Sequence, residues 1–311
     1  MLKEKLTKAL LCIVLAAGVL LQPLHAQPAE SGTGQTDATP SRLDEVIDSG
    51  KLRVGVNPDF RPFSFVDESG KRVGVDIRIA QKLADALGVE LEIVAPDNFA
   101  DLIPMLTDDK VDVVIAGMSI TFDRARQVNF TDPYFDTGTS MLMNIGHSAK
   151  LGIGNVKDAD QLIEQLRSSG NESQLKIAVT EGKSPAAVAK RLFPDATITG
   201  YPTNEDAAEA TFKGDANLMI HDEVFLKVWL QANESRARFR MVVLDPPIKP
   251  DFYGMATRKG DLEWLQLLNV FVHEMRANHQ VESYLARFLP NMNTDQMFDR
   301  QPLRFDIEDM E

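Results

Sequence analysis

The stretch Lys110–Arg124, KVDVVIAGMSITFDR, joins a mostly apolar run to a polar turn. Its first part, Lys110 to Ala116, predicts a buried strand that ends at Gly117. Two hydroxyl side chains follow, and Arg124 comes in the next turn. Because a guanidinium holds a carboxylate through two parallel hydrogen bonds, this order of residues predicts a site for a small carboxylate at the end of a strand.

On both sides of this stretch, predicted strands alternate with predicted helices. From Asp76 to Leu87, apolar residues recur at four-residue spacing, and Gly88 follows as a helix end. Other strands are expected at 51–56, 89–94, 175–180, 196–201 and 215–220, and other helices start at Asn98 or span 185–193, 205–212, 224–231, 262–278 and 281–288. The alternation predicts an α/β protein with mostly parallel sheets covered by helices on both faces.

The two runs of strands predict two lobes that face each other. In open α/β sheets, ligands bind beyond the carboxyl ends of the strands, so two such sheets would enclose a ligand between them. We expect residues 41–143 and 245–290 to form lobe 1, and residues 144–244 to form lobe 2. The chain would cross between the lobes near 141–145 and 241–244. Residues 291–311 are polar and acidic, which predicts a C-terminal tail.

The N-terminus has the parts of a secretory signal peptide. Three lysines precede an apolar run from Leu10 to Leu21, and cleavage is expected after Ala26, so residues 1–26 form the signal. The run is too short for a lasting membrane span. Cys12 is the only cysteine and leaves with the signal, so no disulfide is expected in the mature chain. Residues 27–40 are rich in small and turn-forming residues, which predicts a flexible tether.

The composition narrows the class of partner. The formal net charge is −13 over 311 residues, which argues against nucleic acid and against anionic lipid surfaces. The acidic residues are spread along the chain and predict a self-repelling soluble surface. The histidines of the mature chain, His147, His221, His273 and His279, lack metal-ligand spacing, so no metal and no cofactor is expected.

Further residues extend the predicted site, each with an open alternative. Asp222 follows an apolar strand and either accepts from a ligand ammonium or caps the next helix. In the turn Gly182–Pro185, backbone N–H groups and Lys183 favour an anion near Ser184, unless the lysine points into solvent. Phe60 either walls the ligand or packs in the core. Arg124 either binds the carboxylate, or caps a helix or pairs with its acidic neighbour.

Several short motifs follow one another in a definite order along residues 41–290. They are Leu52–Val56 with Pro62–Phe65, Gly74–Asp76, Val111–Thr121 with Arg124, Val128–Tyr134, Gly214–Ala216, Asp222 and Tyr253-Gly254. In this combination the chain resembles the family 3 extracellular solute-binding proteins of polar amino-acid ABC transporters. The resemblance implies a periplasmic-binding-protein-like fold: two α/β lobes joined by two crossing segments, with the ligand cleft between them.

The resemblance also implies roles for individual residues. In that family the arginine matching Arg124 holds the ligand α-carboxylate, helped by groups matching Ser119 and Thr121. The backbone near Gly117 and an acid hold the α-amino group, and an aromatic ring packs on the ligand. The implied ligand-binding set is Arg124, Asp222, Ser119, Thr121, Gly117, Phe60, Asn57, Lys183 and Ser184.

Two of these positions predict the kind of ligand side chain. Relatives that bind basic amino acids often carry an acid where Asn57 stands, and the family commonly has threonine where Lys183 stands. Asn57 cannot offset a ligand cation, and Lys183 would repel one. We therefore expect a neutral polar or acidic amino acid, or a similar small carboxylate, rather than lysine, arginine or histidine.

The function implied is capture and delivery without catalysis. The resemblance implies a periplasmic monomer, not embedded in the membrane, that hands a small amino acid to an ABC transporter permease. One alternative is an enzyme similar to periplasmic cyclohexadienyl dehydratase, which places a catalytic Glu on the helix after the second-lobe glycine turn. Here that helix opens Pro185-Ala186-Ala187, with no acid. The other alternative is the ligand-sensing subunit of a signalling system.

Overall fold

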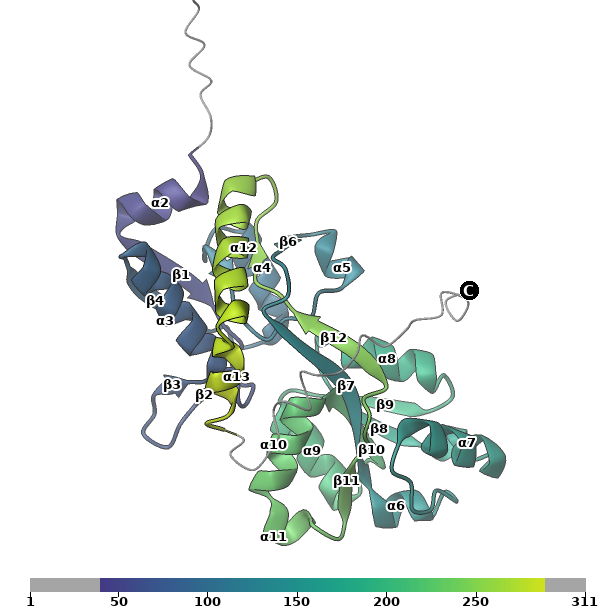
Figure 1. Ribbon diagram of the computed structural model, residues 1–311. Coiled ribbons are helices and arrows are strands. Elements are labelled where there is room, and N and C mark those ends of the chain that lie inside the picture. Colours follow the sequence, from purple (N-terminus) through teal and green to yellow (C-terminus); the bar gives the residue numbers. More distant parts are fainter. Residues whose placement is uncertain (1–39, 289–311) are drawn as a thin grey trace, which may run out of the picture. The chain divides into compact units, whose positions relative to one another are not determined.

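The computed structural model describes residues 40–288, which fold around two large β-sheets and a two-stranded one (Figure 1). Across the first large sheet, the strands are β4 (Glu90–Val94), β1 (Lys51–Gly55), β5 (Val113–Val114), β13 (Ala256–Thr257) and β6 (Asn129–Phe130). β1 pairs in parallel with β4 and β5, whereas β13 is antiparallel to β5 and β6. The small sheet is a hairpin of β2 (Phe65–Val66) and β3 (Arg72–Val73).

Cap residues mark the ends of two helices in this first part. Ser41 and Asp44 form a reciprocal capping box at the start of the helix Arg42–Ser49, and Gly88 ends the helix Val75–Leu87 in the left-handed conformation. The helix predicted at 281–288 is shorter and ends at Leu285. The helices are α2 (Arg42–Ser49), α3 (Val75–Leu87), η1 (Phe99–Asp101), α4 (Leu102–Thr107), α5 (Phe122–Ala125), α12 (Leu262–Ala277) and α13 (Gln280–Leu285). α13 contacts both α12 and α3, so the end of the described chain returns to the first sheet.

The second large sheet combines parallel and antiparallel strands. Across it lie β11 (Met241–Val243), β7 (Phe135–Asn144), β10 (Leu218–Asp222), β8 (Lys176–Thr180) and β9 (Thr197–Tyr201), with β12 (Lys249–Tyr253) also paired to β7. β10, β8 and β9 are parallel, whereas β7 is antiparallel to its three partners. The helices are α6 (Ile145–Ala149), α7 (Ala159–Ser169), η2 (Glu172–Gln174), α8 (Pro185–Leu192), α9 (Asn204–Lys213), α10 (Glu223–Ala232) and α11 (Glu234–Ala237).

The crossing segments lie elsewhere than the sequence predicts. Met141–Asn144 pairs with β10 and β11, so the predicted segment 141–145 lies almost wholly inside the second sheet. Met241–Val243 is β11 itself, which makes the predicted segment 241–244 wrong for the same reason. The chain instead enters the second sheet at the start of β7 and leaves it at the end of β12, and these two strands pair with each other. An apolar run in the sequence predicts a strand, but it does not show which other strands pair with it. The division into two lobes as folding units stays a prediction.

Two strands differ in extent from their predictions. The expected strand 110–116 contains only β5, although its flanks still bond to β1: Asp112 N donates to Arg53 O (2.8 Å) and Ile115 N to Gly55 O (2.9 Å). The expected strand 215–220 is β10, which starts later and runs on to Asp222 because it pairs with Thr139 of β7. This extension carries Asp222 to the carboxyl end of a buried strand.

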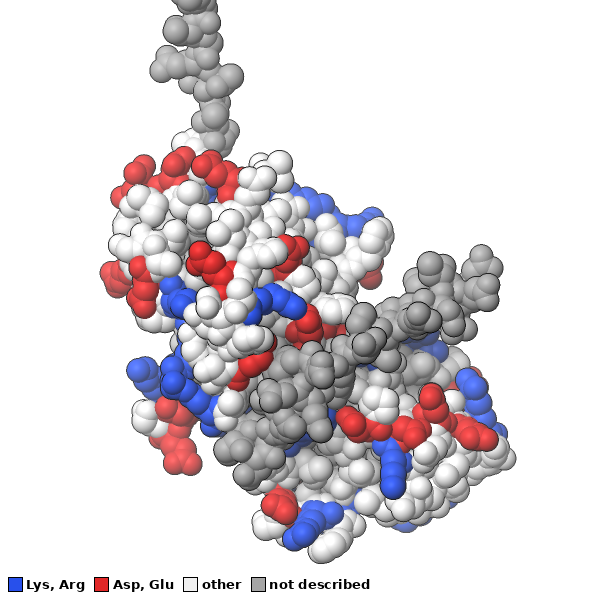
Figure 2. Space-filling view, viewed as in Figure 1, with Lys and Arg blue, Asp and Glu red and all other residues white. Residues whose placement is uncertain are grey.

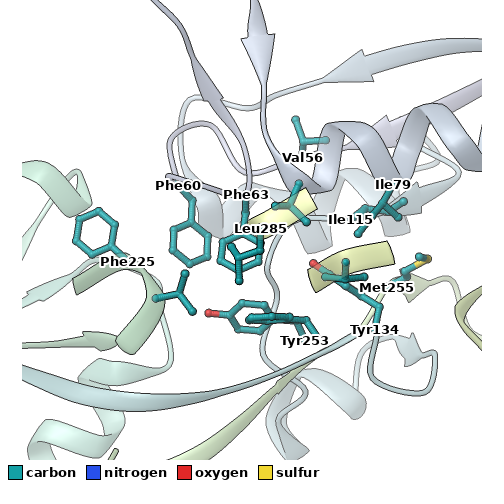
Figure 3. Packing of buried hydrophobic residues seen from close by; sticks show 14 of the residues in the cluster. Val56, Phe60, Phe63, Ile79, Ile115, Tyr134, Phe225, Tyr253, Met255 and Leu285 are labelled. Carbon is teal, nitrogen blue, oxygen red and sulfur yellow. The ribbon is translucent and has the colours of Figure 1, made fainter. Parts of the chain in front are cut away.

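An aromatic cluster fills the space between the two sheets. Phe60 and Phe63, from the loop after β1, lie 4.8 Å apart between ring centroids (Figure 3). They pack on Tyr253 of β12 at 6.2 Å and 5.3 Å, respectively. Phe225 of α10 approaches Phe60 from the second sheet, at 6.4 Å. The rings form part of one buried cluster with the side chains that cover β1 and β5.

On the face drawn in Figure 2, charge is spread rather than concentrated. Acidic and basic side chains both occur over this face. Within residues 40–288, none of the helices is both long and apolar enough to cross a bilayer. The predicted signal peptide, the tail, and all of the tether except Pro40 lie outside the described residues.

Candidate ligand-binding site

A cavity lies where the carboxyl ends of strands from both sheets meet. Its volume is about 310 Å³, including its open mouth. The lining residues are Asn57, Phe60, Phe99, Gly117, Ser119, Arg124, Lys183, Ser184, Pro185, His221, Asp222, Asp251 and Tyr253. β1 and β5 lead into the residues from the first sheet, whereas β8, β10 and β12 supply or lead into those from the second. The position is the one expected for an open α/β sheet.

Eight of the nine residues predicted for the site line this cavity, and Thr121 does not. Thr121 is the N-cap of α5, and its Oγ1 accepts from the backbone N–H of Arg124 at 3.3 Å. Its hydroxyl therefore holds the turn that carries Arg124. A hydroxyl followed by a helical turn is a capping signal, and capping is the role the structure gives it.

Arg124 lies on the anion side of the cavity. Its Nη1 donates to Ser119 O at 3.0 Å, and its Nη2 to Gly182 O at 3.4 Å. Burial lowers the pKa of Arg124, yet an arginine stays charged. No ion pair to Asp123 exists among the described residues, which removes the surface-pair alternative. A charged guanidinium bonded to neutral carbonyls retains attraction for a carboxylate.

A chain of hydroxyls runs beside the arginine. Ser119 Oγ donates to Asp251 Oδ2 at 2.7 Å, and it lies 3.0 Å from Ser184 Oγ. Because the Ser119 proton points to Asp251, Ser184 is the donor in the second bond. Ser184 stands at the N-cap position of α8 but makes no side-chain cap bond. A serine at this position is often a cap, but here the contact with Ser119 uses its hydroxyl.

Asp222 caps the helix that follows it and also lies at the cavity. Its Oδ1 accepts from the backbone N–H groups of Val224 (2.8 Å) and Phe225 (3.1 Å), which caps α10. Its Oδ2 accepts from Thr137 Oγ1, and the carboxyl also lines the cavity. Burial raises the pKa of Asp222 to about 7, against the opposing effect of hydrogen bonds from Thr137 and Tyr253. A buried carboxyl in this state gains strongly from a cation beside it.

Gly117 is fixed by a buried network. Its N–H donates to Tyr134 Oη at 2.9 Å, and Tyr134 Oη donates to Asp76 Oδ1 at 2.8 Å. Asp76 is fully buried at the start of α3, and burial raises its pKa to about 7. Asn57 is equally enclosed, and its Nδ2 donates to Ala116 O at 3.3 Å. The polar edge of the first sheet is therefore set before any ligand arrives.

Phe60 packs in the core beside the cavity, and Lys183 does not point into solvent. Phe60 is 2% exposed within the core cluster, and it also lines the cavity. Lys183 Nζ donates to Asn204 Oδ1 at 3.0 Å and lies 4.6 Å from the Phe60 ring centroid. Burial lowers the pKa of Lys183 to about 7, with Asp59 as the largest opposing charge.

Sequence reasoning missed five residues of the lining: Phe99, Pro185, His221, Asp251 and Tyr253. His221 is 2% exposed, and neither ring nitrogen has a hydrogen-bond partner among the described residues. Burial, followed by the charge of Lys183, lowers its pKa well below the usual value, so the imidazole is neutral. Its position just before Asp222, at a strand end, was a usable signal. Asp251 was recognisable too, because strand alternation puts it on the face of Tyr253.

Comparisons with known proteins agree with this architecture. Cyclohexadienyl dehydratase of Pseudomonas aeruginosa is 30% identical over 219 residues, which cover 70% of this chain and 71% of that protein. The glutamine-binding protein of Geobacillus stearothermophilus is 29% identical, over 72% of this chain and 79% of its own. Among solved structures, the ancestral amino acid-binding protein AncCDT-1, a precursor of cyclohexadienyl dehydratase, is similar with a TM-score of 0.65 and 32% identity, covering 80% and 98%.

The predicted fold class is confirmed by these neighbours and by the α/β architecture. The model of the bacterial extracellular solute-binding proteins, family 3, matches residues 52–291. That range contains every residue of the cavity lining. The chain belongs to the bacterial extracellular solute-binding proteins of family 3.

Proposed function

We propose that this chain captures a small amino acid, or a similar small carboxylate, and delivers it to an ABC transporter permease. The observation that carries the proposal is the pairing of opposite charges in one cavity: Arg124 on one side and Asp222 on the other. A zwitterion presents a carboxylate and an ammonium a few ångströms apart, so it satisfies both. The glutamine-binding and ancestral amino acid-binding relatives support this ligand class.

In this proposal each end of the ligand has its own partners. The α-carboxylate bonds to Arg124, and the hydroxyls of Ser119 and Ser184 turn away from their present partners to donate to it. The ammonium donates to Asp222, and the ring of Phe60 packs on the ligand. Contacts already join the two sides of the cavity, as in the pair Ser119–Ser184. Binding would favour the state in which the two sides meet, and a permease would recognise that state.

The cellular setting is part of the same proposal. A family of extracellular solute-binding proteins supports action outside the cytoplasm, after removal of the signal peptide, as a monomer. Reconstitution with a candidate permease tests delivery: ligand-loaded protein should stimulate its ATPase, whereas ligand-free protein should not. Equal stimulation by both forms would contradict delivery, and stimulation of a sensor kinase instead would favour the signalling role.

An enzyme is the second candidate because a relative with 30% identity is a cyclohexadienyl dehydratase. Asp222 and Asp251 both have raised pKa values through burial, as a general acid requires. Against it, the resemblance places a catalytic acid on the helix after the glycine turn, and that helix, α8, contains no acid. Incubation with a cyclohexadienyl substrate should give no dehydrated product. Turnover that disappears in Asp222→Asn would establish the enzyme instead.

The direct test of binding is a thermal-shift screen of residues 27–311 against single amino acids. A ligand at a hundred times its dissociation constant adds about 2.7 kcal/mol of apparent stability. We expect at least one amino acid to raise the melting temperature by several degrees, and calorimetry to give one site per chain. A flat response to every amino acid and small carboxylate would refute the proposed ligand class.

A further inference from the structure

We propose that Lys183 is a built-in cation that occupies the aromatic site where a cationic ligand side chain would bind. The cavity therefore rejects basic amino acids and selects a ligand whose side chain accepts hydrogen bonds. The inference rests on the proposed function, because it assigns the specificity of the same cavity.

The position of the ammonium is that of a cation between two rings. Lys183 Nζ lies 4.6 Å from the centroid of Phe60 and 5.2 Å from that of Phe99. Both distances are within the range at which an aromatic face attracts a cation. The two rings come from different segments, the loop after β1 and η1, so the site exists only in the folded protein. A ligand ammonium or guanidinium would need this same place.

Asn204 holds the lysine there. Asn204 is fully buried, and its Oδ1 accepts from Lys183 Nζ (3.0 Å) and from Thr180 Oγ1 (2.9 Å). Its Nδ2 donates to Asp59 O at 3.4 Å. These contacts fix the orientation of the amide, with its oxygen toward the ammonium. The lysine is thus anchored by a buried residue of α9 whose side chain is itself held by Thr180 and by the backbone of Asp59.

The conformation of Gly182, just before the lysine, also helps to place the ammonium between the rings. Gly182 has φ +70°, and a Cβ there would lie 3.1 Å from Ala100 Cβ. Ala100 is next to Phe99 in η1, so the close approach of this turn brings Lys183 against the Phe99 ring. Glycine permits both the positive φ and the approach. The turn therefore aims the lysine into the cavity.

The charge of the lysine is left for a ligand to use. Among residues 40–288, no carboxylate lies within 4 Å of Nζ, and its one described hydrogen bond goes to a neutral amide. An ammonium has three donors, so N–H groups remain that an amide or carboxylate oxygen can accept. Asp59 and Glu205 are the strongest opposing charges, and Lys183 already uses them. A second cation at this place would meet direct repulsion from Lys183, to which Arg124 adds.

The experiment is calorimetric titration of four ligands at pH 6.5: glutamine, glutamate, arginine and lysine. Lys183 has a pKa near 7, so its charged form predominates at this pH. Asp222 meets the amino group that all four ligands share, so its titration leaves their ratios unchanged. We expect the wild type to bind glutamine or glutamate at least about 30-fold more tightly than arginine and lysine.

Three variants distinguish an effect of the Lys183 charge on binding from a general effect on folding. Lys183→Ala empties the place between the rings, so affinity for arginine or lysine should rise at least about 10-fold while that for glutamate falls. Lys183→Arg keeps the charge and should keep the wild-type order of ligands. Lys190→Ala, at an exposed position of α8, is the matched control and should change nothing.

The outcomes distinguish this inference from the proposed function. If the wild type binds arginine or lysine as tightly as glutamine and glutamate, amino-acid binding stands and the role of Lys183 is refuted. An unchanged order of ligands in Lys183→Ala refutes it as well. If the folded wild type binds no amino acid, the proposed function fails and the inference with it.

Discussion

Arg124 is the residue on which the predicted carboxylate site depends most. Its guanidinium is bonded to two backbone carbonyls and to no carboxylate in the described residues, so in the proposed function the ligand would supply the counter-charge. We expect Arg124→Ala to weaken amino-acid binding by at least ~2 kcal/mol, because it leaves the ligand carboxylate desolvated and unpaired. Calorimetry measures the loss, and the exposed neighbour Arg126→Ala is the control. Equal affinity in both variants would remove Arg124 from the site.

Asp222 combines helix capping with the predicted contact to the ligand ammonium, and one substitution separates the two. Asn caps a helix as well as Asp does but carries no charge. Asp222→Asn should therefore melt close to the wild type, yet bind at least about tenfold more weakly. A large fall in melting temperature with unchanged affinity would show that Asp222 is only a cap.

The raised pKa of Asp222 predicts a pH dependence of binding. Because burial raises this pKa to about 7, the carboxyl is protonated below pH 7 and cannot pair with an ammonium. The wild-type dissociation constant should rise by up to about tenfold per pH unit as the pH falls from 7 to 5.5. Asp222→Asn should lack this slope. The same slope in both proteins would assign it to another group.

At the scale of elements, the junction between β3 and α3 fixes the loop that carries the aromatic rings. The first N–H groups of α3 donate to that loop, from Val75 to Pro62 O (3.0 Å) and from Asp76 to Phe63 O (2.9 Å). Gly74 makes the junction possible, because it has φ +135° and a Cβ there would clash with the carbonyls of Pro62 and Phe63. The helix thereby positions Phe60 at the cavity.

Gly74→Ala should therefore destabilise the protein by more than about 2 kcal/mol, because the loop and the helix must separate. Gly50→Ala is the matched control: it also replaces a glycine with positive φ, but nothing lies within 4 Å of its Cβ. That control should cost about 1 kcal/mol from backbone strain alone. Urea denaturation measures both, and equal costs would show that the close approach is unimportant.

At the scale of the whole described chain, β7 and β12 are the strands that connect the two sheets. Their pairing from Phe135 to Thr139 makes one two-stranded ribbon at the connection. Any closing motion then bends the chain where this ribbon leaves the second sheet, next to Tyr134 and Gly254, rather than inside it. The same ribbon carries Asp251 and Tyr253 into the cavity, so motion and binding share one element.

Small-angle scattering tests this motion. Saturating amino acid should reduce the radius of gyration, because the ligand draws the two sides of the cavity together. A double variant, Ser119→Cys with Ser184→Cys, provides a fixed reference, since the two hydroxyl oxygens lie only 3.0 Å apart. After oxidation its radius should not respond to ligand. A wild type as unresponsive as this reference would contradict closure.

The sequence by itself determined the local features. Helix caps, strand ends and the turn before Arg124 depend on residues within a few positions of one another, so periodicity and capping rules find them. Eight of the nine residues predicted for the site, such as Arg124 and Asp222, line the cavity. Thr121 was misplaced because a capping hydroxyl and a ligand-binding hydroxyl look alike in sequence.

Only the tertiary structure decided which side chains meet across the cavity. Ser119 contacts Asp251 across 132 positions of sequence and Ser184 across 65, and no local pattern encodes such contacts. The crossing segments were misplaced for a related reason: an apolar run predicts a strand but not its partners. Lys183 turned inward because Asn204 and two aromatic rings, distant in sequence, surround its nitrogen in the folded chain. Burial and pairing are properties of the whole fold, so they appear only when its parts pack together.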